Sequence, residues 1–109
     1  MAKQTDSLQG TLDLLILKTL NRGSNHGFGI TLHIQTVSGG ALRPEEGSIY
    51  PALRRIERYG SIKGAWRTTE NCRQARYYEL TRTGRKRLSE IESRWTALTE
   101  AVDKVMRFA

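Results

Sequence analysis

Hydrophobic residues recur at helical spacing through the first half of the chain, and they predict three helices there. The first covers residues 12–20 and is apolar on nearly every side. A helix of this kind is buried on more than one face, and in so short a chain we expect a second subunit to supply part of the cover. The second helix opens at residues 25–29. Its inner stripe consists of Ile30, Ile34 and Val37.

The third predicted helix is amphipathic. Its apolar side consists of Ile49, Leu53 and Ile56, and its opposite side of Tyr50, Pro51, Arg54 and Arg58. A start at residues 46–48 would place Pro51 in the first turn, where its missing N–H costs little. Such a helix can pack on a small core while its other side meets a polyanion. An ordinary surface helix with a basic side would show the same pattern.

After Gly60 the hydrophobic period changes from 3.6 to 2, which is typical of strands. Residues 61–67 and 75–81 predict a hairpin joined by the polar loop 68–74. The residues expected on its core side are Ile62, Tyr78 and Leu80. Two helices, a basic third helix and a basic hairpin follow the order of a winged helix-turn-helix, with the hairpin as the wing.

The last segment carries a narrow apolar stripe with members 3, 4, 3, 4 and 3 residues apart. This is the a/d pattern of helices packed along a seam. Its members are Leu88, Ile91, Trp95, Leu98, Val102 and Val105. Thr81 is a good N-cap for the segment. We expect the stripe to form a homodimer, although packing inside its own domain would use the same pattern.

The number of basic residues and their positions add to this prediction. The chain has 109 residues, enough for one domain with a modest core, and its net charge is +7. The excess is concentrated: residues 54–87 contain eleven bases and three acids. Such a concentration indicates a polyanionic partner, either nucleic acid or an anionic membrane surface.

Several classes of protein are disfavoured. The single cysteine, Cys72, allows no internal disulfide and fits a reducing cytosol; a redox role beside Arg73 remains an alternative. His26, expected to start a helix, and His33, expected on the surface, do not make a metal pair. No apolar run approaches a membrane span, and the first residues lack a signal-peptide core. We therefore expect a cytoplasmic protein without metal or cofactor and without membrane contact.

No serine–histidine–aspartate set, phosphate loop or carboxylate pair appears in the chain, so we expect no catalytic residues and no enzyme. The sequence instead resembles the PadR-type transcriptional regulators, in particular the short subgroup with a single C-terminal helix. The resemblance is carried by residues 12–17 (LDLLIL), 26–30 (HGFGI), 46–53 (EGSIYPAL) and 75–81 (ARYYELT) with Gly84. These stretches keep the family's order and place roughly residues 8–107 within it. Phe28 and Ile49 stand where tyrosine and leucine are common.

The resemblance implies a mainly α fold with a small β-hairpin (α+β). A winged helix-turn-helix of residues 1–81 would be followed by a dimerisation helix of residues 82–109, the two forming one compact unit. It further implies a homodimeric repressor on a palindromic operator in double-stranded DNA, with the third helix in the major groove. Some members bind phenolic acids or flat aromatic drugs near the dimer interface, which makes Trp95 the candidate contact for a small aromatic effector.

The predicted DNA-binding residues have different expected roles. Ser48, Tyr50 and Pro51 fall on the family's DNA-facing motif, and Ser48 and Tyr50 are expected on phosphates. Arg54 is the candidate base reader, because arginine can bind guanine bidentately. The wing should add sequence-tolerant affinity through Lys63, Arg73 and Arg76. The alternative function is a basic dimeric winged-helix module without effector control, either architectural or a protein adaptor.

Overall fold

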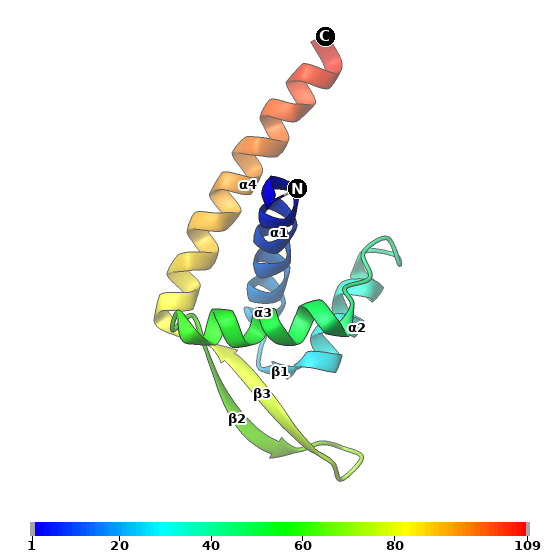
Figure 1. Cartoon of the computed structure of the whole chain (residues 1–109), viewed down its shortest axis with the longest axis vertical. Helices are drawn as coiled ribbons and strands as arrows, with labels where there is room; N and C mark the ends of the chain where they lie inside the picture. Colours follow the sequence, from blue (N-terminus) through cyan, green and yellow to red (C-terminus); the bar gives the residue numbers. More distant parts are fainter. Residues whose placement is uncertain (1, 109) are drawn as a thin grey trace.

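The computed structural model describes the backbone of residues 2–108 and the side chains of residues 11–45 and 47–108. Along this part of the chain the elements are α1 (Ala2–Leu20), β1 (Asn25–His26), α2 (Gly27–Val37), α3 (Glu46–Arg58), β2 (Ile62–Thr68), β3 (Gln74–Leu80) and α4 (Arg82–Phe108). The strands form one antiparallel sheet in the order β1-β3-β2. In Figure 1, α4 extends past the other elements at one end of the molecule, and the β2–β3 hairpin projects at the other. The predicted winged helix-turn-helix architecture is confirmed.

The hydrophobic core is centred on α1. Ile16 and Leu17 are almost completely buried, because α2, α3, α4 and β3 all pack against this helix. Leu12 and Leu15 are partly buried at the edge of the same core. The chain's own elements therefore supply most of the cover that we expected from a second subunit.

The start of α2 differs from the prediction. Asn25 and His26 form a short strand that pairs with Tyr78 and Tyr77 of β3, and the helix begins only at Gly27. Two residues are too few to show a period of two, so the sequence pattern could not reveal this strand. His26 does start the helix as predicted, since its Nδ1 accepts a hydrogen bond from the Gly29 N–H at 3.1 Å.

Two smaller expectations about α2 and α3 were wrong. Val37 is 68% exposed because it is the last residue of α2 and lies beyond the core. Pro51 lies in the second turn of α3 rather than the first, because the helix already begins at Glu46. Its missing N–H would have bonded the Gly47 carbonyl. Gly47 and Pro51 are both exposed, so water can reach the unpaired carbonyl.

The hairpin joins the core through its near half and leaves it in the far half. Its register runs from Ile62 opposite Leu80 to Thr68 opposite Gln74. The residues predicted on the core side, Ile62, Tyr78 and Leu80, are all buried. We call the β2–β3 hairpin the wing, and residues 68–74 its tip.

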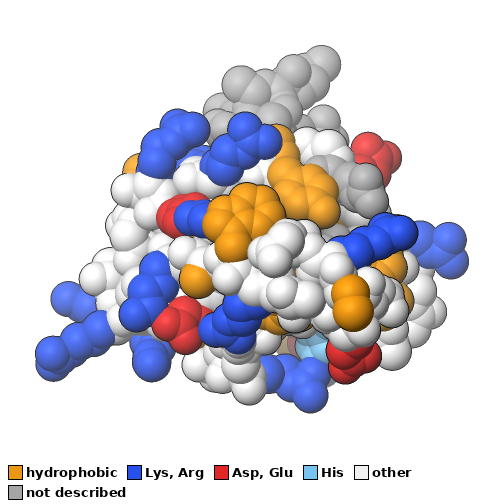
Figure 2. Space-filling view, turned by 90° about the horizontal axis from the view of Figure 1, so that it is seen from below, with side chains coloured by type: hydrophobic (Ala, Val, Ile, Leu, Met, Phe, Trp, Pro, Cys, Tyr) orange, Lys and Arg blue, Asp and Glu red, His pale blue; other side chains and the backbone are white. Residues whose placement is uncertain are grey.

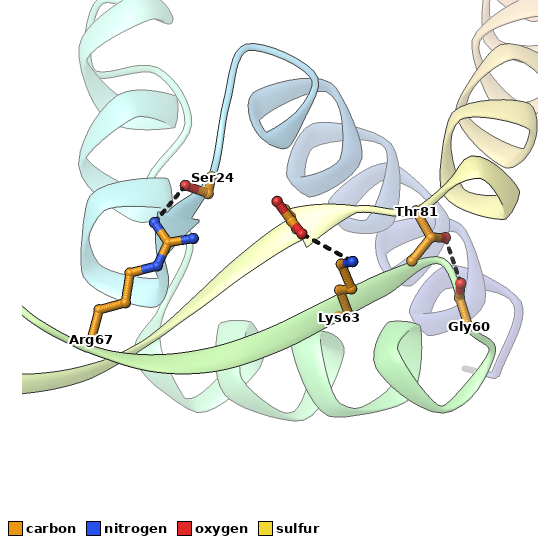
Figure 3. Close-up of polar contacts among 6 residues, drawn as sticks. Ser24, Gly60, Lys63, Arg67 and Thr81 are labelled. Carbon is orange, nitrogen blue, oxygen red and sulfur yellow. Dashed lines mark hydrogen bonds and ion pairs between the residues drawn. The ribbon is translucent and has the colours of Figure 1, made fainter.

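The first turn of α4 is fixed against the base of the wing. Thr81 Oγ1 accepts a hydrogen bond from the Gly84 N–H at 3.0 Å and donates one to the Gly60 carbonyl at 2.6 Å (Figure 3). A Cβ at Gly84 would lie 1.9 Å from the Ser61 carbonyl oxygen. Glycine is therefore required where α4 crosses this backbone.

The apolar stripe of α4 divides into two parts. Leu88 is buried in the chain's own core, and Ile91 packs against that core. Little surface of either side chain is therefore available to a second subunit. Trp95, Leu98, Val102 and Val105 lie further along and are 42–62% exposed. Only this second part is open to an intermolecular seam.

Candidate nucleic-acid interface

The outer side of α3 is the first part of the candidate interface. Ile49, Ala52, Leu53 and Ile56 are buried against the core, which turns the rest of the helix outward. The predicted DNA-binding residues of this helix, Ser48, Tyr50, Pro51 and Arg54, are all exposed.

Tyr50 is held by a close approach between α3 and α2. Its ring lies over Gly27, where a Cβ would be 2.8 Å from Tyr50 Cε1. The glycine therefore allows the ring to pack on the first residue of α2. Tyr50 nevertheless remains 43% exposed, so it is positioned by the fold and still accessible.

Arg54 and Arg55 have different surroundings although they are neighbours in the sequence. Arg54 is exposed and makes no hydrogen bond or ion pair with the described residues. Arg55 is half-buried and donates a hydrogen bond to Asp13 of α1. Burial raises the pKa of the Asp13 carboxyl, and the Arg55 guanidinium opposes that shift. Arg55 thus joins α3 to α1.

The wing is tied to α3 through Arg76. Its Nη2 donates a hydrogen bond to Glu57 Oε2 at 2.7 Å, and its guanidinium carbon lies 5.8 Å from the centre of the Tyr78 ring. A Cβ at Gly64 would be 2.6 Å from Arg76 Nε, so the absence of a side chain there makes room for the arginine. Burial and the nearby Glu57 carboxylate raise the pKa of Tyr78.

The outside of the wing is also partly internally paired. Lys63 forms an ion pair with Glu79, the residue opposite it on β3, at 3.3 Å (Figure 3). Arg67 Nη1 donates a hydrogen bond to Ser24 Oγ at 3.1 Å, which links the wing to the segment after α1 (Figure 3). Arg73 lies at the exposed tip, and its guanidinium makes no bond with the described residues.

Seen from below, more Lys and Arg than Asp and Glu side chains are visible, and several surround exposed hydrophobic side chains (Figure 2). A surface with this charge is suited to a polyanion. Residues 16–90 match the model of the transcriptional regulator PadR-like family. The chain belongs to this family. It is therefore a DNA-binding transcriptional regulator with a winged helix-turn-helix.

Solved structures of PadR-like and other regulators share this architecture. A transcriptional regulator from Clostridium thermocellum is 26% identical, with a TM-score of 0.81 over 91% of this chain and 93% of that one. A PadR family regulator from Eggerthella lenta is 26% identical, with a TM-score of 0.75 over 99% and 93%. A PadR-like regulator from Bacillus cereus has a TM-score of 0.79 over 95% and 99%; at 23% identity it supports the fold alone.

The geometry separates the predicted DNA-binding residues of this PadR-like chain into two groups. The residues on the outer side of α3, together with Arg73, are exposed and open to a ligand. Arg76 and Lys63 already bind acids of the same chain. Contact between DNA and Arg76 would require it to leave Glu57, or to share its guanidinium between the two.

Sequence reasoning missed Trp66, which is 65% exposed on the wing. It shares a strand side with Ile62 and Gly64, so the period of two would assign it to the core. It is exposed because the wing extends beyond the core at this point (Figure 1). The feature of the sequence that could have pointed to Trp66 is an aromatic residue within a basic hairpin.

Metal-binding clusters and membrane-spanning helices are both lacking in the part of the chain that the structure describes. No three His, Cys, Asp or Glu side chains gather there in a way that would hold a metal ion. None of its helices combines the length and apolar character needed to cross a membrane.

Proposed function

We propose that this PadR-like protein is a cytoplasmic homodimeric repressor that binds a palindromic operator through α3 and the wing and responds to a flat aromatic effector. The observation that carries the proposal is the exposed basic surface of α3 and the wing tip. Arg54 and Arg73 are both exposed, and their guanidinium groups make no hydrogen bond or ion pair with the described residues; Ser48 and Tyr50 add hydroxyl groups on the outer side of α3. Arginine can read a guanine edge, while hydroxyl groups suit phosphate oxygens.

The second half of α4 supports the homodimer. Trp95, Leu98, Val102 and Val105 form an exposed apolar stripe at alternating spacings of 3 and 4 residues. A second copy carries the same stripe, so a two-fold pairing would cover both at once. Such a dimer would present two α3 helices to half-sites about one DNA turn, ~34 Å, apart. Burial of Leu88 in the core would hold each seam fixed relative to its DNA-binding face.

Substitution within the exposed stripe tests the dimer. Leu98→Asp combined with Val102→Asp should yield a folded monomer in analytical ultracentrifugation and weaken DNA binding, because a charge cannot be buried in the seam without a partner. Thr99→Asp places one such charge on an exposed position outside the stripe and should remain dimeric. A double variant that stays dimeric would refute the seam.

Trp95 supports the effector part of the proposal. It is 42% exposed where α4 leaves the core, so a flat aromatic molecule could stack on it. Such a ligand would change DNA affinity only through different affinities for two dimer geometries. Trp95 fluorescence, measured in a Trp66→Phe background, should respond to some phenolic acids or planar drugs. No response across a broad panel would refute effector binding at this site.

DNA competition tests the function as a whole. A sequence-specific repressor should prefer DNA upstream of its own gene over random DNA by about 10³ or more, and footprinting should show two related half-sites. Similar affinity for both DNAs would favour an architectural protein. No binding to either would favour a protein adaptor.

A further inference from the structure

A cavity of about 790 Å³ lies between the wing and the start of α2. Its walls carry ring side chains from five elements, which we call the aromatic basin: His26, Phe28, Tyr50, Trp66 and Tyr77. Arg73 of the wing tip lines the same cavity. The basin belongs neither to the hydrophobic core nor to the apolar stripe of α4.

The inner wall of the basin is built rigidly. The His26 ring is fixed by the hydrogen bond that its Nδ1 accepts from Gly29. It stacks on Phe28 with ring centres 6.4 Å apart and meets the Tyr77 ring edge-on at 5.0 Å. The backbones of His26 and Tyr77 are also paired between β1 and β3. These rings are therefore held in place before any ligand arrives.

Two large side chains of the basin are left open to solvent. Phe28 is 62% exposed on α2, and Trp66 is 65% exposed on the wing. Covering exposed aromatic surface of this size with a partner lowers the free energy of the complex. Both residues line the one cavity, so a single partner can cover them together.

Charge and continuity identify the partner. Arg73, whose guanidinium makes no bond with the described residues, adds a cation to a lining that also includes Glu70 and the Glu57-bound Arg76. Tyr50 belongs both to the basin and to the outer side of α3, so the two surfaces are continuous. A DNA strand alternates anionic phosphates with deoxyribose rings that have apolar faces, so it can place a phosphate on Arg73 and deoxyribose on the aromatic rings.

We propose that the aromatic basin receives one sugar–phosphate strand of the bound DNA, with deoxyribose packed on Trp66 and Phe28 and a phosphate on Arg73. This inference rests on the proposed DNA-binding face of α3 and the wing. It divides the affinity into two components. Phosphate contact by Arg73 weakens as salt rises, whereas apolar contact by Trp66 and Phe28 does not depend on counterion release.

Anisotropy titrations of operator DNA at several salt concentrations, from about 50 to about 300 mM, separate these components. Trp66→Ala and Phe28→Ala should each bind about tenfold more weakly at every salt concentration, with an unchanged slope of log K against log salt. Arg73→Ala should reduce that slope by about 0.9 per lost phosphate contact, or about 1.8 for a dimer. Tyr59→Ala removes another exposed aromatic, outside the basin, and should bind as the wild type does.

Fluorescence supplies a readout that a merely structural role would not change. In a Trp95→Phe background, only Trp66 emits as a tryptophan. DNA should shift its emission and protect it from quenching by acrylamide. This measurement uses protein with an intact basin, so it remains decisive if an alanine variant folds poorly.

Failure of this inference can be told apart from failure of the proposed function. Unchanged affinity of Trp66→Ala and Phe28→Ala, with Trp66 still open to acrylamide, would overturn the basin contact. Weakened binding by Arg54→Ala and Arg73→Ala in the same experiment would leave the proposed function standing. If all four variants bind DNA as the wild type does, both proposals fail.

Discussion

In the unit formed by α3 and the wing, arginines on the inner side have partners within the chain that arginines on the outer side lack among the described residues. On the inner side, Arg55 binds Asp13 and Arg76 binds Glu57. On the outer side, Arg54 and Arg73 are exposed and unpaired within the described part of the chain. The inner arginines connect elements of the fold, while the outer ones are open to a phosphate or a base.

Because of this difference, net charge alone is a poor guide to the affinity for DNA. The inner ion pairs join residues 42 and 19 positions apart in the sequence, so their acids are not visible near the arginines they neutralise. Arg55 is therefore neutralised by an acid outside residues 54–87, whereas Glu57 is already one of the three acids counted there. The affinity for DNA should depend on the outer arginines, and the stability of the fold on the inner ones.

The largest expected effect is on DNA binding by Arg54→Ala. A bidentate contact with a base contributes about 1–3 kcal/mol to discrimination, and a dimer would lose two such contacts. Operator affinity should fall about 100-fold or more while the free energy of unfolding changes little. Fluorescence anisotropy and urea denaturation measure the two quantities.

Arg58→Ala is the matched control for Arg54→Ala. Arg58 is also exposed, one turn further along α3, and lies closer to the end of the helix. Its substitution should weaken DNA binding much less. Equal losses for the two variants would mean that the arginines act only through overall charge.

Arg55→Ala should reverse this pattern by reducing stability and sparing DNA affinity. It leaves the half-buried Asp13 carboxylate unpaired, which should cost about 1–2 kcal/mol of unfolding free energy at pH 7. The pKa of Asp13 is already raised in the folded protein, so folding becomes less favourable as pH rises from about 4 through that raised value. Loss of Arg55 should raise the pKa further, and the deficit should therefore be smaller at pH 5 than at pH 7. A deficit independent of pH would contradict the role of this pair.

Glu57→Gln and Gly64→Ala test the inner contact of the wing. Each should lower the unfolding free energy by about 1 kcal/mol, because one removes the acceptor of Arg76 and the other places a methyl group against its guanidinium. Both act on one contact, so the double variant should lose less than the sum of the single losses. Additive losses in urea denaturation would show that Gly64 matters for another reason.

The smallest effect concerns alkaline pH. Because the pKa of Tyr78 is raised in the folded protein, the folded state retains this proton more strongly than the unfolded chain does. Stability should therefore fall as pH rises from about 10 through the raised value. Tyr78→Phe cannot ionise, so its melting temperature should fall less between pH 9 and pH 11. Equal falls in both proteins would contradict this assignment.

Local patterns predicted the elements well where many residues contribute to a period. The stripe of Ile49, Leu53 and Ile56 and the alternation in the wing both led to the correct buried side. The winged helix-turn-helix and the role of His26 as the residue that starts α2 followed from order and capping. The two-residue strand β1 has no period of its own and depends on β3, far along the chain.

The site was less accessible to prediction because its contacts join distant segments. Arg76 appears free in the sequence, and only the register of the hairpin and the gap at Gly64 bring it to Glu57. A heptad pattern cannot distinguish packing within a chain from packing between chains. Leu88 accordingly belongs to the core, while Leu98 ten residues later is exposed.

The length of α4 gives the molecule a mechanical property. The helix is continuous from Arg82 to Phe108, so about 30 Å separate its anchor at Leu88 from its far end. A tilt of about 10° at that anchor would displace the end by about 5 Å, as a lever does. If two copies are joined along their far halves, the same tilt instead displaces the DNA-binding faces. Ångström-scale changes near Trp95 would then decide whether both faces reach successive major grooves.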